Sequence, residues 1–350
     1  MNVLITGNLG YVGPILCKVL RNYYPSVNIV GYDSAFFAND LVDLEVNPEY
    51  LVDTQHYGDI RDIKEDFLIG IDSVIHLAAI SNDPMGVEFE NVTEEINRSA
   101  SVRLAQIAIN AGVKNFVYAS SCSMYGYSEG GARKETDPTN PLTSYAKSKI
   151  GTEEDVKKLS LGNMIFTSLR FATACGWSPR LRLDLVLNDF VASAISVSKI
   201  TVQSDGSPWR PLIDVEDMAR AIAWAILRKK EEGGQFLAIN AGKNINNFQV
   251  KVIADKVAEQ LPGTIISINE NAPPDKRSYA VDFSLFESLA PNFVPQIKLE
   301  ESIRRLIFNL NHLGFNDKDF RNSNFIRLNS LRNRIKNNNL STGLRWIYNN

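Results

Sequence analysis

Short apolar runs alternate with longer amphipathic stretches through the first half of the chain. The apolar runs predict strands at residues 3–6, 28–32, 73–78, 115–120 and 165–170. The stretches between several of them predict helices at residues 14–23, 92–111 and 144–161. Strands that alternate with helices of this length indicate a doubly wound α/β fold, in which right-handed crossovers join parallel strands and helices cover both faces of the sheet.

The regular alternation ends at about residue 172. Stretches rich in Pro, Gly, Asn or Asp, at residues 176–179, 204–211 and 271–276, separate shorter predicted helices at 217–229 and 247–260. We therefore predict an N-terminal α/β domain over residues 1–172 and a smaller lobe over residues 173–350. Some segments of the lobe are expected to return to the N-terminal domain.

The composition is that of an ordinary globular protein. Of the 350 residues, 44% are hydrophobic and 22% are charged, and the formal net charge is −3. This balance excludes the fibrous and disordered classes, and no apolar run is long enough to indicate a membrane span. Because there is no excess of positive charge, we expect no nucleic-acid partner.

Cysteine and histidine are both scarce. Cys17, Cys122 and Cys175 lie far apart without a CxxC pair, and the three histidines have no metal-ligand spacing. We therefore expect no metal site and no disulfide framework. The unpaired cysteines, and an N-terminus without the features of a signal peptide, favour a cytoplasmic location.

The first predicted strand runs into the sequence TGNLGYVG, and a predicted helix follows directly. Gly7, Gly10 and Gly13 are three residues apart in this turn. A first glycine allows the tight turn, a second lets backbone approach a diphosphate, and a third lets the helix pack closely on the strand. Between a strand and a helix, this spacing predicts a dinucleotide-binding Rossmann domain.

Asp33 follows Gly13 by 20 residues and lies at the end of the next predicted strand. A carboxylate at this place accepts hydrogen bonds from the adenosine ribose and repels a 2′-phosphate. Because no arginine follows Asp33 closely, the sequence favours NAD over NADP. The alternative is a structural glycine turn beside an unrelated surface aspartate.

Tyr145 and Lys149 are four residues apart on a predicted helix and therefore project from one face. A tyrosine is a poor base at neutral pH, but a cation one turn away and an oxidised nicotinamide both favour the phenolate. Ser120 and Ser121 end the strand predicted at 115–120, at the sheet edge where ligands bind in this fold. Alone, a Tyr/Lys pair is also typical of an exposed helix surface, so the serines strengthen the argument.

In this order the segments resemble the extended short-chain dehydrogenase/reductase superfamily, specifically its nucleotide-sugar epimerases and dehydratases of the UDP-glucose 4-epimerase type. The resemblance covers nearly the whole chain. It rests on TGNLGYVG, Gly58-Asp59-Ile60, HLAA at 76–79, ASSCSMYG at 119–126, YAKSK at 145–149 and WRPLIDVED at 209–217.

The resemblance implies three catalytic residues, Ser121, Tyr145 and Lys149, with Tyr145 as the acid/base. Asp59 and Ile60 would contact the adenine. The full set of implied NAD-binding residues is Gly7, Gly10, Tyr11, Val12, Gly13, Asp33, Asp59, Ile60, Leu77, Ala78, Ala79, Asn97, Tyr145 and Lys149.

The resemblance also implies a set of substrate-binding residues: Ser121, Ser123, Tyr145, Thr173, Asn188, Arg210 and Asp275. Arg210 would bind the diphosphate of a sugar nucleotide, because the guanidinium group of arginine is planar and always charged. Thr173 stands where galactose epimerases have Asn, so the sugar is left open. Arg180, Arg182 and Arg277 fit either further phosphate contacts or surface ion pairs.

The implied reaction is hydride transfer at a sugar carbinol, usually C4, through a transient 4-keto sugar. Family 4,6-dehydratases have Asp-Glu directly after the serine, whereas this chain has Cys122-Ser123. We therefore expect an NAD-dependent nucleotide-sugar epimerase, most simply at C4. The alternatives are a 4-dehydrogenase or 4-keto reductase, a 4,6-dehydratase, or, in another class, a non-catalytic nucleotide-binding protein.

Cys122 has two interpretations. Its thiol could act as an acid/base for C3 or C5 epimerisation, as in GDP-mannose 3,5-epimerases. The cysteine of those enzymes stands one position nearer the tyrosine, where this chain has Ser123, so we favour a buried and inert Cys122.

Two features concern the periphery of the fold. Residues 318–350 carry seven Lys or Arg, nine Asn and one acidic residue, which fits a solvated tail or a contact with a nucleotide phosphate or partner subunit. Apolar residues in it indicate that at least part docks on the body: Phe325, Leu328, Leu331, Leu344 and Trp346. The resemblance also implies a homodimer formed by the helices at 97–111 and 145–161.

Overall fold

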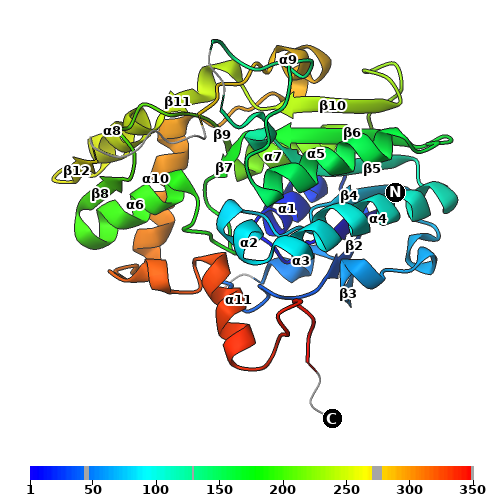
Figure 1. Ribbon diagram of the computed structural model, residues 1–350, viewed down its shortest axis with the longest axis horizontal. Helices are drawn as coiled ribbons and strands as arrows, with labels where there is room; N and C mark the ends of the chain where they lie inside the picture. The colour runs from blue at the N-terminus through cyan, green and yellow to red at the C-terminus, as the bar shows by residue number, and fades with distance from the viewer. Residues whose placement is uncertain (43–46, 128–129, 270–277, 348–350) are drawn as a thin grey trace.

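The first half of the chain is built around one large parallel sheet (Figure 1). The computed structural model describes residues 1–42, 47–127, 130–269 and 278–347. Within them the sheet has seven strands in the order β10-β6-β5-β4-β1-β2-β3. These are β1 (Asn2–Thr6), β2 (Asn28–Asp33), β3 (Thr54–Tyr57), β4 (Ser73–His76), β5 (Asn115–Ser121), β6 (Ile165–Phe171) and β10 (Phe236–Ala241). The predicted doubly wound parallel sheet is confirmed.

Alternate residues of the central strand β1 pack in two separate hydrophobic clusters. Val3 and Ile5 belong to a cluster that includes residues of α1 and α7, whereas Leu4 belongs to a cluster with residues of α4. Successive side chains of a strand point to opposite faces, so helices cover both faces. The helices of this half are α1 (Gly13–Tyr23), α2 (Asp83–Glu88), α3 (Glu90–Glu94), α4 (Ala100–Asn110), α5 (Ser144–Lys157) and α7 (Val215–Ala225).

The prediction of a single helix over residues 92–111 is wrong in one respect. A π-helical turn at Glu95–Ser99 separates α3 from α4. The extra residue of a π turn shifts the side chains around it relative to a regular helix, and such turns are frequent at functional sites. The turn contains Asn97, which lies next to the groove described below.

The second half forms a smaller body at the left of Figure 1. Its two small sheets have the strand orders β11-β9-β7 and β12-β8. Leu187, Ile253 and Ile303, from three different helices, are fully buried in one apolar cluster beside these sheets. The elements of this body are β7 (Thr173–Cys175), β8 (Lys199–Val202), β9 (Trp209–Asp214), β11 (Asn247–Gln249), β12 (Ile265–Ile268), α6 (Val186–Val197), α8 (Val250–Gln260) and α10 (Leu299–His312). Two further helices pack on the N-terminal half instead: α9 (Ser284–Leu289), which lies against β10, and α11 (Arg327–Lys336).

The basic, Asn-rich C-terminal segment docks on the body of the protein. Leu331 and Leu344 are fully buried, and they pack in the same cluster as Leu4 and Phe36. A wholly solvated tail is therefore wrong for residues up to 347, because these apolar side chains are covered by the N-terminal half.

Candidate active site

A groove runs along the carboxyl ends of the parallel strands, which is the edge where ligands bind in doubly wound sheets. All of the predicted cofactor-binding and catalytic residues except Gly13 and Asn97 line it. The lining residues from that set are Gly7, Gly10, Tyr11, Val12, Asp33, Asp59, Ile60, Leu77, Ala78, Ala79, Ser121, Tyr145 and Lys149.

The turn between β1 and α1 leaves no room for side chains at two glycines. Gly7 has a φ of 78°, and a Cβ there would lie 2.5 Å from the backbone nitrogen of Ala78. A Cβ at Gly13 would lie 1.9 Å from the carbonyl oxygen of Asn8. Among the described residues no side chain caps the N-terminus of α1, so its N–H groups and positive dipole end suit a diphosphate.

Asp33 ends β2 with its carboxylate in the groove. The carboxylate accepts hydrogen bonds from the backbone N–H groups of Leu9 at 2.9 Å and Ala35 at 2.7 Å. Burial raises the pKa of Asp33, and these hydrogen bonds and the charges of Arg180 and Arg327 oppose the rise. A carboxylate so placed accepts hydrogen bonds from ribose hydroxyls and repels a 2′-phosphate, so the groove fits NAD.

Asp59 and Ile60 line the groove beside Asp33. Arg61 lies 2.6 Å from the Asp59 carboxylate and Arg345 lies 3.3 Å from it. Although burial opposes the shift, the hydrogen bonds and charge of Arg61 hold the pKa of Asp59 below its usual value. This end of the groove therefore combines a charged rim with the buried, apolar side chain of Ile60.

Ser121, Tyr145 and Lys149 meet where β5 ends against α5. Ser121 lies close enough to Tyr145 to lower its pKa, and its Oγ accepts a hydrogen bond from the N–H of Ser123 at 3.1 Å. The start of α5 is fixed by Thr143, whose Oγ1 accepts a hydrogen bond from the N–H of Ala146 at 3.2 Å. The ammonium nitrogen of Lys149 lies 5.7 Å from the centre of the Tyr145 ring.

Lys149 and an oxidised nicotinamide were together expected to lower the pKa of Tyr145, but the protein alone shows the opposite shift. Burial raises the pKa of Tyr145 to about 12, and Ser121 and Arg182 are the groups that oppose the rise. Burial also lowers the pKa of Lys149 to about 7. The Lys149 ammonium donates a hydrogen bond to the carbonyl of Ala119 at 2.7 Å. Desolvation thus outweighs the charge–charge effect in the protein alone.

Asn97 supports the groove from behind. Its amide oxygen accepts a hydrogen bond from the N–H of Ile80 at 2.8 Å, and its amide nitrogen donates to the carbonyl of Ile80 at 2.9 Å. The same nitrogen donates to the hydroxyl of Ser148 at 3.1 Å. Asn97 therefore ties the segment after β4 to the helix that carries Tyr145.

A buried polar network behind Lys149 was not predicted. Glu153 is paired with Arg170 at 2.7 Å, and both side chains are nearly inaccessible to solvent. The hydroxyls of Ser120 and Ser168 each donate to Glu153 at 2.7 Å. Arg170 also donates to the hydroxyl of Tyr125 at 3.1 Å. The only signal in the sequence is that Glu153 stands one helical turn beyond Lys149.

Three of the predicted substrate-binding side chains, Ser123, Thr173 and Arg210, line the same groove as Tyr145. The hydroxyl of Ser123 is buried and has no hydrogen-bond partner among the described residues. Arg210 donates a hydrogen bond to the carbonyl of Trp209 at 2.8 Å and lies over the ring of Tyr279. An unpartnered buried hydroxyl at this place suits a polar ligand.

Asn188 and Asp275 are not brought into the groove by the described structure. Asn188 is fully buried, and its amide accepts from the N–H of Gly176 and donates to the carbonyl of Arg182, which holds a loop beside the groove. Asp275 lies outside the described residues, as does Arg277.

Arg180 and Arg182, which fitted either phosphate contacts or surface ion pairs, are both buried and ion-paired. Arg182 lines the groove and pairs with Asp184 at 2.9 Å. Arg180 pairs with Glu49 at 2.8 Å. Neither is a surface ion pair, because the side chains of both arginines are less than a tenth exposed.

Cys122 is fully buried and does not line the groove as described. Its sulfur lies 3.0 Å from the carbonyl oxygen of Arg170. Burial raises the pKa of the Cys122 thiol well above its ordinary value. These observations favour the inert interpretation over an acid/base thiol.

The described residues hold no cluster of three or more His, Cys, Asp or Glu side chains arranged for a metal ion. In the same part of the chain, no helix combines the length and apolar character needed to cross a membrane.

Several known proteins are similar to the chain over most of its length. The Low-salt glycan biosynthesis protein Agl12 of Haloferax volcanii is 24% identical over 315 residues, covering 88% of this chain and 97% of that protein. A dTDP-glucose 4,6-dehydratase of Streptomyces griseus is 24% identical over 311 residues, covering 86% and 92%.

A solved UDP-glucuronic acid 4-epimerase of Bacillus cereus, in complex with UDP-glucuronic acid and NAD, is 22% identical with a TM-score of 0.74. It covers 89% of this chain and 100% of that chain, so the folds agree over most of this chain. The family model of NAD-dependent epimerases and dehydratases matches residues 3–242, which is more than half of the chain. The chain belongs to the NAD-dependent epimerase/dehydratase family.

Proposed function

We propose that the chain is an NAD-dependent nucleotide-sugar epimerase that acts at C4 through a transient 4-keto sugar. The observation that carries the proposal is that Ser121, Tyr145 and Lys149 line the same groove as Asp33. Ser123, which lines this groove with an unpartnered hydroxyl, supports a polar substrate there.

The bound cofactor supplies a hydride acceptor at this site. Tyr145, as the phenolate, takes the proton of the sugar hydroxyl while the hydride leaves the same carbon, so that a ketone forms. Ionisation of Tyr145 is favoured by Ser121 and by the positive charge of an oxidised nicotinamide. Ser121 then donates a hydrogen bond to the developing oxygen charge. Return of the hydride to the other face of the ketone, with the proton from Tyr145, completes the epimerisation.

The remaining roles of the predicted residues form part of the same proposal. The glycine turn and Asp33 would hold the diphosphate and the adenosine ribose, and Lys149 would hold the nicotinamide ribose. Arg210 would bind the diphosphate of the sugar nucleotide, because it lines the same groove as Tyr145 and carries an always charged guanidinium. The division into a cofactor domain over 1–172 and a substrate lobe over 173–350 belongs to this proposal too.

A 4,6-dehydratase is the main alternative, since such enzymes are among the relatives. Elimination of water needs an acid and a base beside the ketone. The two residues after Ser121 are Cys122 and Ser123, which carry no carboxyl group. We therefore favour a reaction that needs only oxidation and reduction at one carbon.

The test is to incubate the purified protein with a panel of sugar nucleotides, without added cofactor, and to follow new anomeric signals by NMR. We expect one substrate to give its C4 epimer. Tyr145→Phe should retain NAD and lose turnover by about a thousandfold or more, because general acid–base catalysis is worth roughly this much.

Tyr50→Phe is the matched control, because Tyr50 is an exposed tyrosine that does not line the groove as described. It should leave turnover unchanged. Near-normal turnover in Tyr145→Phe would remove Tyr145 from the mechanism. Strict dependence on added NADPH would contradict both the epimerase and the role of Asp33.

We also propose a homodimer and a cytoplasmic location. The resemblance supports a homodimer through α4 and α5, which sedimentation of the purified protein would test. Cys17, Cys122 and Cys175 are free thiols, which supports the reducing cytoplasm.

A further inference from the structure

The C-terminal segment, residues 320–347, lies across the rim of the cofactor groove. In Figure 1 it descends from the end of α10 and carries α11 below α2. It lies outside residues 3–242, the region that the family shares. The established family match therefore assigns it no role.

The first set of contacts joins this segment to the loop that follows β2. The guanidinium of Arg334 donates a hydrogen bond to the carbonyl of Phe36 at 2.8 Å. The indole nitrogen of Trp346 donates to the carbonyl of Ser34 at 2.6 Å. Both acceptors lie within three residues after Asp33 in the chain, so the segment holds the loop beside the expected ribose position.

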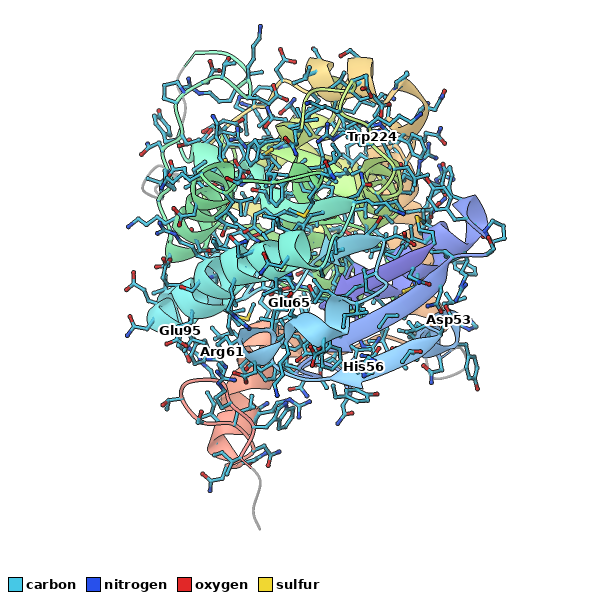
Figure 2. The ribbon with its side chains drawn as sticks, turned by 90° about the vertical axis from the view of Figure 1, so that its right-hand side faces the viewer. Asp53, His56, Arg61, Glu65, Glu95 and Trp224 are labelled. Carbon is cyan, nitrogen blue, oxygen red and sulfur yellow. The ribbon has the colours of Figure 1, made fainter. Side chains whose placement is uncertain are left out.

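The second set of contacts joins the segment to the Asp59–Asp62 turn. Arg61 donates to the carbonyls of Gly343 and Leu344, both at 2.9 Å. Figure 2 shows Arg61 and Glu95 on the flank of the molecule just above the C-terminal segment. Arg345 adds the ion pair with Asp59 at 3.3 Å. The adenine side of the groove is therefore held by the C-terminal segment as well.

Arg327, the first residue of α11, reaches from this segment into the groove. It is 2% exposed and lines the groove. One terminal nitrogen pairs with Asp40 at 2.5 Å, and the other donates to the carbonyl of Arg180 at 3.1 Å. The guanidinium lies 4.5 Å from the ring centre of Phe37. A guanidinium has five N–H donors, so donors remain for a ligand.

The contacts of Arg327 locate it along the groove. On one side its guanidinium contacts Asp40 and Phe37, which belong to the loop after Asp33. It also donates to the carbonyl of Arg180, two residues before Arg182, which lines the groove. Arg182 in turn lies close enough to Tyr145 to affect its pKa. Arg327 is therefore situated between the ribose end and the reacting end, the stretch that the diphosphate of a dinucleotide spans.

We propose that Arg327 binds the diphosphate of the dinucleotide, opposite the glycine turn, and that the C-terminal segment holds the cofactor in the groove. The inference rests on the cofactor assignment alone, so it stands or falls independently of the sugar reaction. Burial lowers the pKa of Arg327 to about 10, which indicates a desolvated cation that an anionic ligand would stabilise.

The test compares the affinities of ADP and adenosine by titration calorimetry, using protein from which bound nucleotide has been removed. In Arg327→Met we expect the affinity for ADP to fall about tenfold to a hundredfold, because charge-assisted hydrogen bonds are lost. The affinity for adenosine, which has no phosphate, should not change. An unchanged ADP affinity, or an equal loss for both ligands, would overturn the proposal.

Arg332→Met is the matched control on the same helix. Arg332 is exposed and pairs with Glu88 away from the groove, so both affinities should stay at the wild-type values. An ADP-specific loss in this control equal to that in Arg327→Met would also overturn the proposal.

A second variant keeps the test valid if Arg327→Met does not fold. Asp40→Asn removes the counter-charge of Arg327 and keeps the guanidinium. If Arg327 binds phosphate, the affinity for ADP should rise severalfold relative to adenosine, because the local potential becomes more positive. If the ion pair is only structural, the ADP-to-adenosine ratio will stay constant or fall, and that result would contradict the proposal.

Discussion

Glu153 stands one helical turn beyond Lys149 on α5, yet its carboxylate is paired with Arg170 at 2.7 Å. The ammonium group of Lys149 instead donates to the carbonyl of Ala119 at 2.7 Å. Lys149 is thus a buried cation whose nearest acidic neighbour is already neutralised. This relationship explains why burial lowers the pKa of Lys149 to about 7, with Glu153 opposing the shift only in part.

The buried Lys149 should give a characteristic dependence of stability on pH. Its pKa is about 7 in the folded chain and 10.5 in its ordinary state. Between these values the unfolded chain binds the proton that the folded chain has released, so stability rises with pH. The slope from this group approaches about 1.4 kcal/mol per pH unit.

Lys149→Met isolates this effect. The free energy of unfolding of the wild type, minus that of the variant, should increase between pH about 7 and about 10, as measured by urea denaturation. A difference that is constant over this range would show that Lys149 keeps an ordinary pKa.

Glu153→Gln should destabilise the protein by about 3 kcal/mol or more, because Arg170 would be left buried without its counter-charge. Glu154→Gln is the control, since Glu154 is the exposed neighbour on the same helix, and it should change stability by less than about 0.5 kcal/mol. Both values come from chemical denaturation. Equal, small effects would mean that the Glu153–Arg170 pair adds little to stability.

Gly13→Ala should weaken both folding and NAD binding. The added methyl group would lie 1.9 Å from the carbonyl oxygen of Asn8, so the glycine turn must shift. Overpacking of this kind costs about 1–3 kcal/mol.

Gly151→Ala is the matched control for Gly13→Ala. The nearest atoms there belong to the flexible side chain of Arg98, at 2.9 Å, which can move aside. We expect unchanged NAD affinity in a calorimetric titration of this variant and a clear loss for Gly13→Ala. Wild-type NAD affinity in Gly13→Ala would contradict the assigned geometry of the turn.

Ser123→Ala should weaken binding of the sugar nucleotide without lowering the stability of the protein. The Ser123 hydroxyl is buried without a partner among the described residues, so its removal should not lower the free energy of unfolding. If the hydroxyl serves the sugar nucleotide, KM should rise severalfold with a stable fold. An unchanged KM would show that Ser123 does not contact the substrate.

The parts of the site that depend on short segments could be predicted from sequence. The glycine turn, Asp33 and the Tyr145–Lys149 pair each follow from local spacing, because a strand, turn or helix fixes their geometry. Five of the seven strands of the large sheet were also predicted, since their apolar character reflects burial in the sheet.

The parts that depend on distant segments could not be predicted. β3 (Thr54–Tyr57) is a polar edge strand, and β10 (Phe236–Ala241) joins the sheet from the second half of the chain, so neither has a local signal of its partner. The same reason applies to Arg327, which reaches the groove from 287 positions beyond Asp40. A π-helical turn at Asn97 has no recognisable periodicity in a single sequence.

The most direct test of the central claim uses a substrate nucleotide sugar that carries deuterium at C4, incubated in ordinary water without added cofactor. The account predicts the C4 epimer with unchanged mass and with the deuterium still at C4, because the hydride leaves and returns within one active site. Loss of the deuterium to solvent, a product that has lost water or carbon dioxide, or a need for added NAD in proportion to product would contradict it.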